Sequence, residues 1–241
     1  MKLRIWVLSG LVLMSGVATC GVRNSAPPAH AVSLAAPSIE KPTDTLRVMT
    51  YNIAHGRKLS FHQALIDDTI IAANLLEIGH MLRRHAPDIA ALQELDGPSA
   101  WSGDFDHARA LGRTAGLQHT FRGSHGDDFG PWNLDYGTGL LSNQRLMRQE
   151  SFRFDASWRD NKGVVLATTN IAQFEDQEVT FVSVHLDFLS ADVREEQLAM
   201  LGKKLEVLDG PLVVMGDFNC TIDEATCVPA FANRLGLKPH Y

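Results

Sequence analysis

Short apolar runs recur along this sequence, and most of them end in polar residues. Residues 46–53 alternate between apolar and polar positions, as a half-buried strand requires. Several of the other runs are continuously apolar and rich in β-branched residues, which is typical of strands buried on both faces. The pattern predicts strands at 46–53, 88–94, 136–141, 164–169, 179–186 and 213–216.

Between these runs, apolar residues recur at the spacing of an α-helix. Three helical faces are predicted: Ile71, Leu75, Ile78 and Leu82; Phe105, Ala108, Leu111 and Ala115; and Leu198, Leu201, Leu205 and Leu208. The first helix stops before Pro87 and the second ends at Gly116, with Ser102 or Asp104 as its expected N-cap. Strands and helices that alternate throughout the chain indicate a layered α/β or α+β domain.

Residues 1–44 do not follow this pattern. Lys2 and Arg4 precede an apolar run that is too short to cross a bilayer, so we expect residues 1–19 to be an export signal. The signal ends in a stretch that resembles the bacterial lipoprotein cleavage box, in which Cys20 would be lipidated; plain secretion is the alternative. Residues 20–44 are rich in Pro, Ala and Ser and are expected to form a tether.

The composition is that of one large globular domain, which we place at 45–241. The whole chain has 241 residues, of which 45% are hydrophobic and 21% charged, and its net charge is −6. An acidic balance disfavours a protein that binds mainly to the nucleic-acid backbone, but it does not exclude a nuclease. Cys220 and Cys227 could close a small disulfide loop in an oxidising compartment or remain two free thiols.

Oxygen-bearing side chains stand where the predicted strands end. Asn52 and Glu94 follow two of them, and the sequence VVMGDFNC places Asp217 and Asn219 at the exit of another. The spacing of this last pair lets both side chains face one way, or lets them form an Asx turn that caps the strand. The 179–186 strand delivers His185, followed by Asp187.

If these strands lie side by side, their ends form one acidic and amide-rich pocket that holds an imidazole. Carboxylate and amide oxygens suit a hard cation, so Mg²⁺ or Mn²⁺ is expected in preference to zinc.

Five motifs now carry a resemblance, because their order and spacing are similar to those of the endonuclease/exonuclease/phosphatase superfamily. They are Asn52 in MTYNI, Glu94 in ALQELD, GTGLLS at 137–142, His185 in VSVHLD and GDFN at 216–219. The superfamily includes secreted deoxyribonucleases, apurinic-site endonucleases, neutral sphingomyelinases and inositol polyphosphate 5-phosphatases. The resemblance implies an α+β fold, a four-layer α/β/β/α sandwich of two packed mixed sheets flanked by helices, with a phosphoester cleaved at the strand ends.

The resemblance also implies roles for the site residues. Glu94 is the main metal ligand and Asn52 supports it, with Mg²⁺ or Mn²⁺ as the cofactor. Asp217 orients or deprotonates the attacking water, Asn219 holds the phosphate, and His185 binds a nonbridging oxygen or helps the leaving group. Tyr136 joins His185 and Asn219 in binding the substrate. These roles agree with the negative charge that phosphoester attack develops on the phosphoryl oxygens.

The sequence departs from the family pattern in two places. Thr138 stands where relatives often carry Asn, in a run that is mostly structural. Relatives also end with an Asp-His pair on a last strand, and no such dipeptide follows GDFN here; His240 follows Pro239 and is not a convincing substitute. We expect the chain to be a fragment that lacks the last strands, with a catalytically inactive binding domain as the alternative.

Five further segments remain, and the first three have both a structural and a functional interpretation. Residues 55–58 could meet phosphate or form a surface turn, and residues 123–130 are expected to be a solvated loop, with a metal or substrate role for His125 as the alternative. The others are Asp106 and His107, which could line the pocket or begin a helix; Arg194 and Gln197, which should support His185; and His80 and His85, which should lie at the surface.

The predicted protein is an exported, monomeric, metal-dependent phosphoester hydrolase of the periplasm or cell envelope, held at the membrane where Cys20 is lipidated. A small phosphoester or a phospholipid head group fits the acidic charge better than a long nucleic acid does. A secreted endonuclease and an inactive binding domain remain the alternatives.

Overall fold

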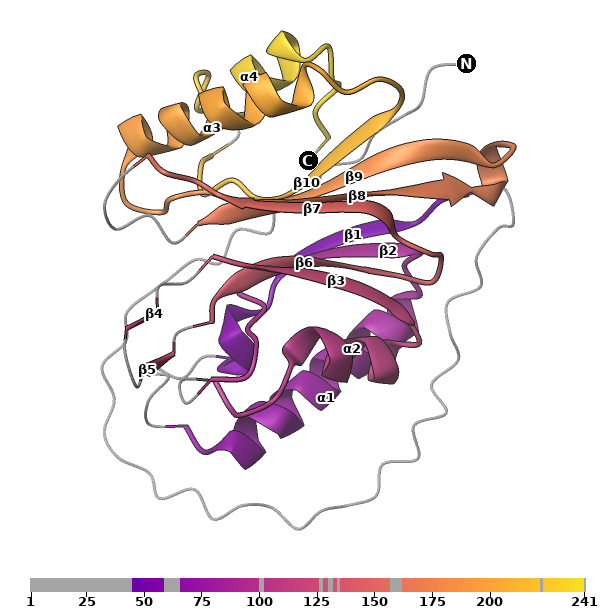
Figure 1. Cartoon of the computed structure of the whole chain (residues 1–241), viewed down its shortest axis with the longest axis vertical. Helices are drawn as coiled ribbons and strands as arrows, with labels where there is room; N and C mark the ends of the chain where they lie inside the picture. Colours follow the sequence, from indigo (N-terminus) through magenta and orange to yellow (C-terminus); the bar gives the residue numbers. More distant parts are fainter. Residues whose placement is uncertain are drawn as a thin grey trace.

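The computed structural model describes residues 45–58, 66–99, 102–125, 128–129, 132–133, 135–156, 162–221 and 223–240. The predicted signal, the tether and Cys20 therefore lie outside the described residues, as does part of the 123–130 loop. The domain consists of two four-stranded sheets packed face to face, with helices on both outer faces (Figure 1). This is the α/β/β/α sandwich that the resemblance implies, and the prediction of the fold is confirmed.

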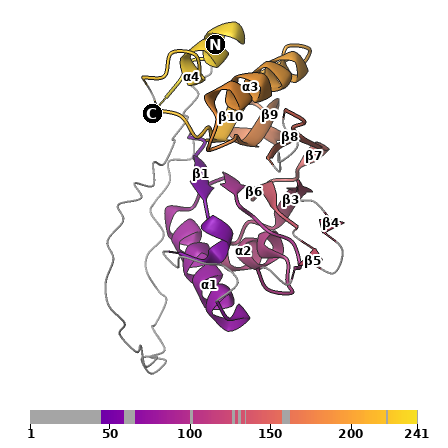
Figure 2. The same ribbon diagram turned by 90° about the vertical axis from the view of Figure 1, so that its left-hand side faces the viewer.

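The first sheet has the order β1-β2-β6-β3. Its strands are β1 (Val48–Asn52), β2 (Ile89–Gln93), β6 (Gly137–Ser142) and β3 (His119–Ser124). β1 and β2 are parallel, whereas β6 is antiparallel to both of its neighbours. Helices α1 (Asp68–His85) and α2 (His107–Ala115) cover the outer face of this sheet (Figure 2).

The second sheet has the order β10-β9-β8-β7. Its strands are β10 (Leu212–Asp217), β9 (Gln177–His185), β8 (Gly163–Ile171) and β7 (Met147–Arg153). β10 and β9 are parallel, and the β9–β8 and β8–β7 pairs are antiparallel. The outer face carries α3 (Ala191–Leu205) and α4 (Val228–Arg234) (Figure 1). Two short strands, β4 (Asp128–Phe129) and β5 (Trp132–Asn133), form a separate hairpin.

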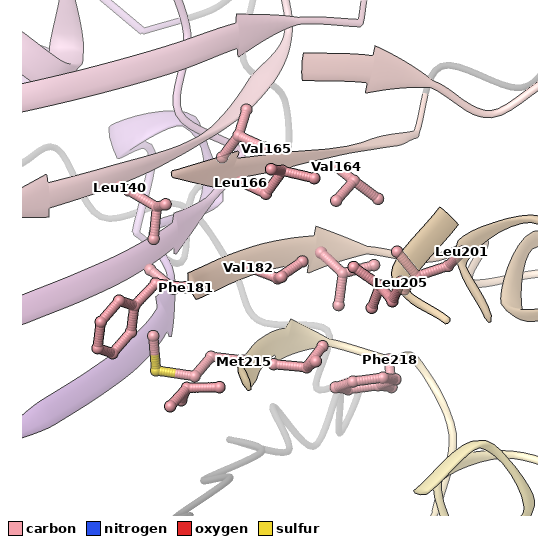
Figure 3. Close-up of a cluster of buried hydrophobic side chains, with 14 of the residues drawn as sticks. Leu140, Val164, Val165, Leu166, Phe181, Val182, Leu201, Leu205, Met215 and Phe218 are labelled. Atoms are coloured by element: carbon pink, nitrogen blue, oxygen red, sulfur yellow. The ribbon is translucent and has the colours of Figure 1, made fainter. Parts of the chain in front are cut away.

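The continuous apolar runs in the sequence are explained by burial on both faces of each sheet. In β2, Ile89 and Ala91 join the cluster between the sheets, while Ala90 and Leu92 join the cluster beneath α1 and α2. Alternate residues of a strand point to opposite faces, so a strand buried on both sides has no polar position to show. Figure 3 shows part of the larger cluster, to which β6 contributes Leu140 and α3 contributes residues such as Leu201 and Leu205.

The predicted start of α2 is wrong by several residues. The helix begins at His107, and its N-cap is Asp106, whose Oδ1 accepts the Arg109 backbone N–H at 3.0 Å. Ser102 hydrogen-bonds instead with the Ser99 hydroxyl, 3.1 Å away. Phe105 matches the apolar spacing of the helix but lies before the cap, and this misled the assignment. The predicted end at Gly116, which adopts the left-handed conformation, is confirmed.

The strands β3 and β7, the short hairpin β4–β5 and the helix α4 were not predicted. β7 is an edge strand of mostly exposed polar residues, MRQESFR, so it has no apolar run to reveal it. α4 is short and its sequence, VPAFANR, gives little more than one turn of periodicity. Within the described residues, no helix is both long and apolar enough to cross a membrane.

Candidate active site

The polar strand ends meet in one cleft, but they come from two sheets rather than one. Asn52 is the last residue of β1 and Glu94 directly follows the parallel strand β2, while His185 and Asp217 are paired in register at the ends of β9 and β10. β1 lies opposite β10 in the sandwich, so the two pairs face each other. The cleft has a volume of about 580 Å³ and is lined by Asn52, Ala54, His55, Arg57, Glu94, His125, Tyr136, Gly137, Thr138, Lys162, Gly163, His185, Phe188, Asp217 and Asn219.

Asn52 links the two sheets. Its amide Nδ2 donates to Glu94 Oε1 at 3.2 Å and to Asp217 Oδ2 at 2.9 Å. Its Oδ1 accepts the Ala54 backbone N–H at 3.0 Å, which fixes the orientation of the amide. One neutral side chain therefore holds two carboxylates from opposite sheets within hydrogen-bonding distance of the same nitrogen.

Glu94 lies in an ionic chain that the sequence did not reveal. His55 Nε2 is 3.1 Å from Glu94 Oε2, and His55 Nδ1 is 2.9 Å from Asp96 Oδ2. Burial lowers the pKa of His55, but the Asp96 and Glu94 carboxylates raise it more, and the net shift is upward. Because Asp96 is fully buried, His55 is clamped between an interior carboxylate and the carboxylate of the cleft.

The 55–58 segment thus divides between the two interpretations given to it. His55 and Arg57 line the cleft. Lys58 instead forms an ion pair with Glu77 at the surface, at 2.6 Å. Only the Lys58 end of the segment behaves as a surface turn.

Asp217 and Asn219 satisfy both interpretations of their spacing at once. Asp217 Oδ1 accepts the Asn219 backbone N–H at 3.0 Å, as in an Asx turn, while Oδ2 faces Asn52. Asn219 Nδ2 donates to the Leu186 carbonyl at 2.8 Å and ties the end of β10 to the end of β9. The turn therefore fixes one carboxylate oxygen and leaves the other directed toward the cleft.

Gly216 lets β10 approach β9 closely just before Asp217. A Cβ atom at this position would lie 2.0 Å from the Val184 carbonyl oxygen, and the φ angle is +156°. No other residue fits this backbone without moving the strand.

His185 is buried and is held against a lysine. Its Nε2 lies 3.0 Å from Lys162 Nζ and 3.9 Å from Asp217 Oδ2, and the side chain is only 5% exposed. Burial lowers the pKa of His185 well below its usual value, and the charge of Lys162 lowers it further. The ring is therefore neutral near pH 7. Sequence reasoning missed Lys162, since a single lysine at the start of a strand gives no periodic or motif signal.

His125 is not in a solvated loop, so that expectation is wrong. The residue is 1% exposed, and its Nε2 lies 3.3 Å from the Thr138 hydroxyl at the cleft. A Cβ atom at Gly163 would lie 2.4 Å from His125 Nδ1, which shows how closely the ring packs against β8. Burial lowers the pKa of His125 to about 4, and the nearby Arg122 and Arg153 charges act in the same direction.

Tyr136, which was expected to bind substrate, also lines the cleft. Its ring centroid is 5.3 Å from that of His55. Burial raises the pKa of Tyr136 to about 12, with the negative charges of Asp96 and Glu94 contributing. The hydroxyl therefore keeps its proton and can donate a hydrogen bond into the cleft.

Several candidates lie behind the cleft rather than in it. His107 is buried, with Nε2 2.8 Å from the Ser102 carbonyl, and Asp106 is the N-cap of α2. Asp187 follows His185, but its Oδ1 accepts the backbone N–H groups of Leu189 and Ser190 at 2.8 and 2.7 Å.

Arg194 and Gln197 hold the turn that follows His185. Gln197 Oε1 accepts the Asp187 backbone N–H at 2.8 Å, and Arg194 Nη1 donates to the Asp187 carbonyl at 3.4 Å. The histidines of α1 do not line the cleft: His85 is exposed and His80 is half-buried.

The two cysteines that follow the signal form a disulfide. Cys220 and Cys227 are bonded, which decides between the two alternatives left open by the sequence. The closed loop starts directly after Asn219 and includes Glu224, whose Oε1 is 3.1 Å from Arg194 Nη2. The loop is thereby tied both to the end of β10 and to α3.

The oxygen donors of the cleft fit a hard divalent cation. Glu94 and Asp217 bring two carboxylates to one amide, Asn52, at the wall of an accessible cavity. Mg²⁺ is commonly held by one or two carboxylates and completes its shell with water and substrate oxygens. Within the described residues, no group of three or more His, Cys, Asp or Glu side chains is arranged around a common metal position.

The sequence matches the model of the Endonuclease/Exonuclease/phosphatase family over residues 49–235. The chain belongs to this family. The matched segment contains Asn52, Glu94, His185, Asp217 and Asn219, and it lies within the predicted 45–241 domain. No curated protein sequence matches the chain.

Solved structures of this family share the fold at low sequence identity. A humanized D. rerio TDP2 is 17% identical, with a TM-score of 0.52 over 82% of this chain and 69% of that one. A family protein from Beutenbergia cavernae is 21% identical, with a TM-score of 0.52 over 72% of this chain and 47% of that one. A mannosyl-6-phosphatase from Bacteroides thetaiotaomicron is 15% identical, with a TM-score of 0.56 over 79% and 71%. The chain thus spans about half of the B. cavernae protein.

Proposed function

We propose that this protein is a divalent-cation-dependent hydrolase of small phosphoesters. The observation that carries the proposal is the meeting of Glu94, Asn52, Asp217 and His185 in one cleft, with Lys162 beside them. Two anionic oxygens on one side and a cation on the other match the needs of phosphoryl chemistry, in which a cation and hydrogen-bond donors offset the charge on the phosphoryl oxygens. Membership of the Endonuclease/Exonuclease/phosphatase family agrees with this activity.

Glu94 and Asn52 are the residues that would hold the cation, Mg²⁺ or Mn²⁺. When bound, the ion supplies Lewis-acid polarisation of a phosphoryl oxygen. His55 keeps the Glu94 carboxylate in place from behind, because its other nitrogen is anchored on the buried Asp96. Asn52 would reach the cation through Oδ1, which accepts the Ala54 N–H and keeps a second lone pair, because its Nδ2 donates to Glu94 and Asp217.

Asp217 is the residue placed to orient the attacking water. Its Oδ1 is fixed by the Asn219 N–H, and its Oδ2 faces the cleft beside Asn52. A carboxylate held at one oxygen presents the other in a constant direction, which is what a general base or a water-orienting group requires.

Lys162 and His185 are the residues placed to receive the phosphate. Lys162 supplies a positive charge at the cleft, while the neutral His185 can exchange a hydrogen bond but carries no charge of its own near pH 7. This division favours phosphate binding over leaving-group protonation for His185, because a ring with a strongly lowered pKa is seldom protonated. Asn219 keeps one amide N–H for the substrate while the other is used on the Leu186 carbonyl.

The proposal includes export and a lipid anchor. It is supported by the charged start of the chain, by the short apolar run within residues 1–19 and by the position of Cys20. We expect radiolabelled palmitate to be incorporated into the full chain and not into a Cys20→Ala variant. Labelling of both proteins, or of neither, would remove the anchor and leave a periplasmic or secreted enzyme.

Phosphate release and plasmid nicking, measured side by side, test the activity. We expect the full chain with Mg²⁺ to hydrolyse small phosphoesters such as 4-nitrophenyl phosphate, bis(4-nitrophenyl) phosphate or mannose 6-phosphate, and to lose that activity in excess EDTA. Plasmid nicking that is faster than any of these reactions would favour the endonuclease alternative. No turnover of any of these substrates with Mg²⁺ or Mn²⁺ would favour the inactive binding domain.

A further inference from the structure

Phe188 lines the cleft, and a second exposed apolar residue, Leu189, follows it directly in the chain. Phe188 is 64% exposed and Leu189 is 71% exposed. Both lie in the turn that follows β9, whose last residue is His185. Single exposed apolar residues are common on protein surfaces, but two adjacent large ones bordering a polar cleft form a local apolar patch.

The turn that carries this pair is held rigidly. The Asp187 carboxylate accepts the backbone N–H groups of Leu189 and Ser190, and Ser190 then caps α3 by accepting the Val193 N–H at 3.3 Å. From the other side, Gln197 accepts the Asp187 N–H. The two apolar side chains are therefore presented outward by a fixed backbone instead of folding down onto the sheet.

Phe188 belongs to the cleft as well as to its rim. Its ring centroid is 5.8 Å from Lys162 Nζ, and the same ammonium is 3.0 Å from His185. Among the described residues that line the cleft, Phe188 has the one large side chain without a polar atom. A phosphate that meets Lys162 would therefore place its substituent near an aromatic surface.

We propose that Phe188 and Leu189 form an apolar subsite for the group esterified to the phosphate, so that preferred substrates carry an aryl or alkyl substituent. This inference rests on the proposed phosphoester activity and narrows its substrate class. A sugar or nucleoside substituent would leave polar hydroxyls against the apolar pair, whereas an alkyl or aryl group removes apolar surface from water. The occupant is part of one substrate molecule, bound in continuity with the phosphate position.

Binding of non-hydrolysable alkylphosphonates tests the subsite independently of turnover. We would titrate the full chain with ethylphosphonate and hexylphosphonate in Mg²⁺ by calorimetry. Hexylphosphonate should bind about tenfold more tightly, because a partly exposed subsite recovers only a fraction of the full burial free energy of four methylene groups. In the Phe188→Ala/Leu189→Ala variant the ratio of the two dissociation constants should fall to about twofold or less.

Val207→Ala is the matched control. Val207 is 77% exposed and lies beyond the far end of α3, so it should leave the ratio unchanged. The single variant Leu189→Ala should give an intermediate ratio, and circular dichroism should show that each variant is folded. Since both rim side chains are mostly exposed, their removal leaves no cavity in the core.

Three results would overturn the inference. The first is equal affinity of the wild type for both phosphonates, and the second is an unchanged ratio in the double variant. The third is binding to phosphatidylcholine vesicles that depends on Phe188 and Leu189 without any chain-length effect on phosphonates, because the pair would then contact a membrane. Selective phosphonate binding without hydrolysis of any ester would instead leave the subsite standing and contradict the proposed function.

Discussion

The two halves of the sandwich bring different chemistry to one cleft. The first sheet supplies Glu94 with an interior support, His55 and Asp96, so its contribution is a carboxylate stabilised from within the protein. The second sheet supplies Lys162 and the neutral His185 beside it, with an apolar rim that follows. In the proposed function the first half would hold the cation, and the second would receive the phosphate with its substituent and orient the attacking water through Asp217.

Asn52 lies at the contact between these two halves. It is the contact through which the carboxylates of both halves, Glu94 and Asp217, meet. Because each half contributes its own side chains to the cleft, a variant can change one half while the residues of the other stay in place.

The largest effect is expected in the first half, from Glu94→Gln. The substitution keeps the side-chain volume and removes the charge, so metal-dependent hydrolysis should fall by about 10³-fold with little change in stability. Steady-state kinetics and thermal unfolding measure the two properties. Glu77→Gln is the matched control, since this carboxylate pairs with Lys58 at the surface. Turnover at the wild-type level in Glu94→Gln would remove Glu94 from the mechanism.

A smaller loss is expected in the second half, from Lys162→Met. The phosphate would lose its nearest cation, and kcat/KM should fall by about 10²-fold while the Mg²⁺ dependence stays the same. Lys162→Arg should recover part of the activity. Lys204→Met, at a surface lysine paired with Glu150, should behave as the wild type. A shift in the Mg²⁺ requirement of Lys162→Met would contradict the division between the halves.

Asp96→Asn should affect activity by changing the position of Glu94, because Asp96 itself does not line the cleft. The buried carboxylate anchors His55, which in turn holds Glu94, so its loss should raise the Mg²⁺ concentration for half-maximal activity by about tenfold. The maximal rate at saturating Mg²⁺ should change much less. His80→Gln, on the outer helix α1, is the control. An equal fall in rate at every Mg²⁺ concentration would indicate a different role for Asp96.

The last prediction concerns folding stability alone and His125, which lies where the two halves meet. Burial lowers its pKa to about 4, so the unfolded chain binds the proton more readily between pH 6.5 and 4, and stability should fall as the pH drops through this window. From pH 7 to pH 5 the wild type should lose about 2 kcal/mol more than His125→Gln. Urea unfolding at both pH values measures the difference. Parallel pH profiles of the two proteins would show that His125 is not the group responsible.

Much of the fold was readable from the sequence because its core strands are buried on both faces. The hydrophobic patterns of β1, β2, β9 and β10 showed where each strand ends. The polar residues at those ends, Asn52, Glu94, His185 and Asp217, could therefore be named from the sequence. The edge strand β7 escaped because it has no buried face to impose a pattern.

The support around the site could not be read in the same way. His125 and Lys162 lie in polar segments whose sequences look solvated, and only the packing of β8 against β3 and β9 buries one and directs the other to the cleft. Asp96 was two residues from Glu94 and still went unnoticed, since contact with His55 depends on the turn and not on spacing. Local sequence patterns predict where a strand ends, whereas contacts between residues distant in the chain can be identified only from the folded structure.

Two of the polar residues that follow strands have a backbone conformation that disfavours a side chain. Glu94 has a φ angle of 53° and Asn219 one of 49°, a left-handed region that costs most residues with a Cβ atom about 1 kcal/mol or more relative to glycine, and asparagine less. A screen for heat tolerance that ignored turnover would therefore tend to select glycine at both places. At these two positions, the proposed chemistry requires a side chain that the backbone conformation disfavours.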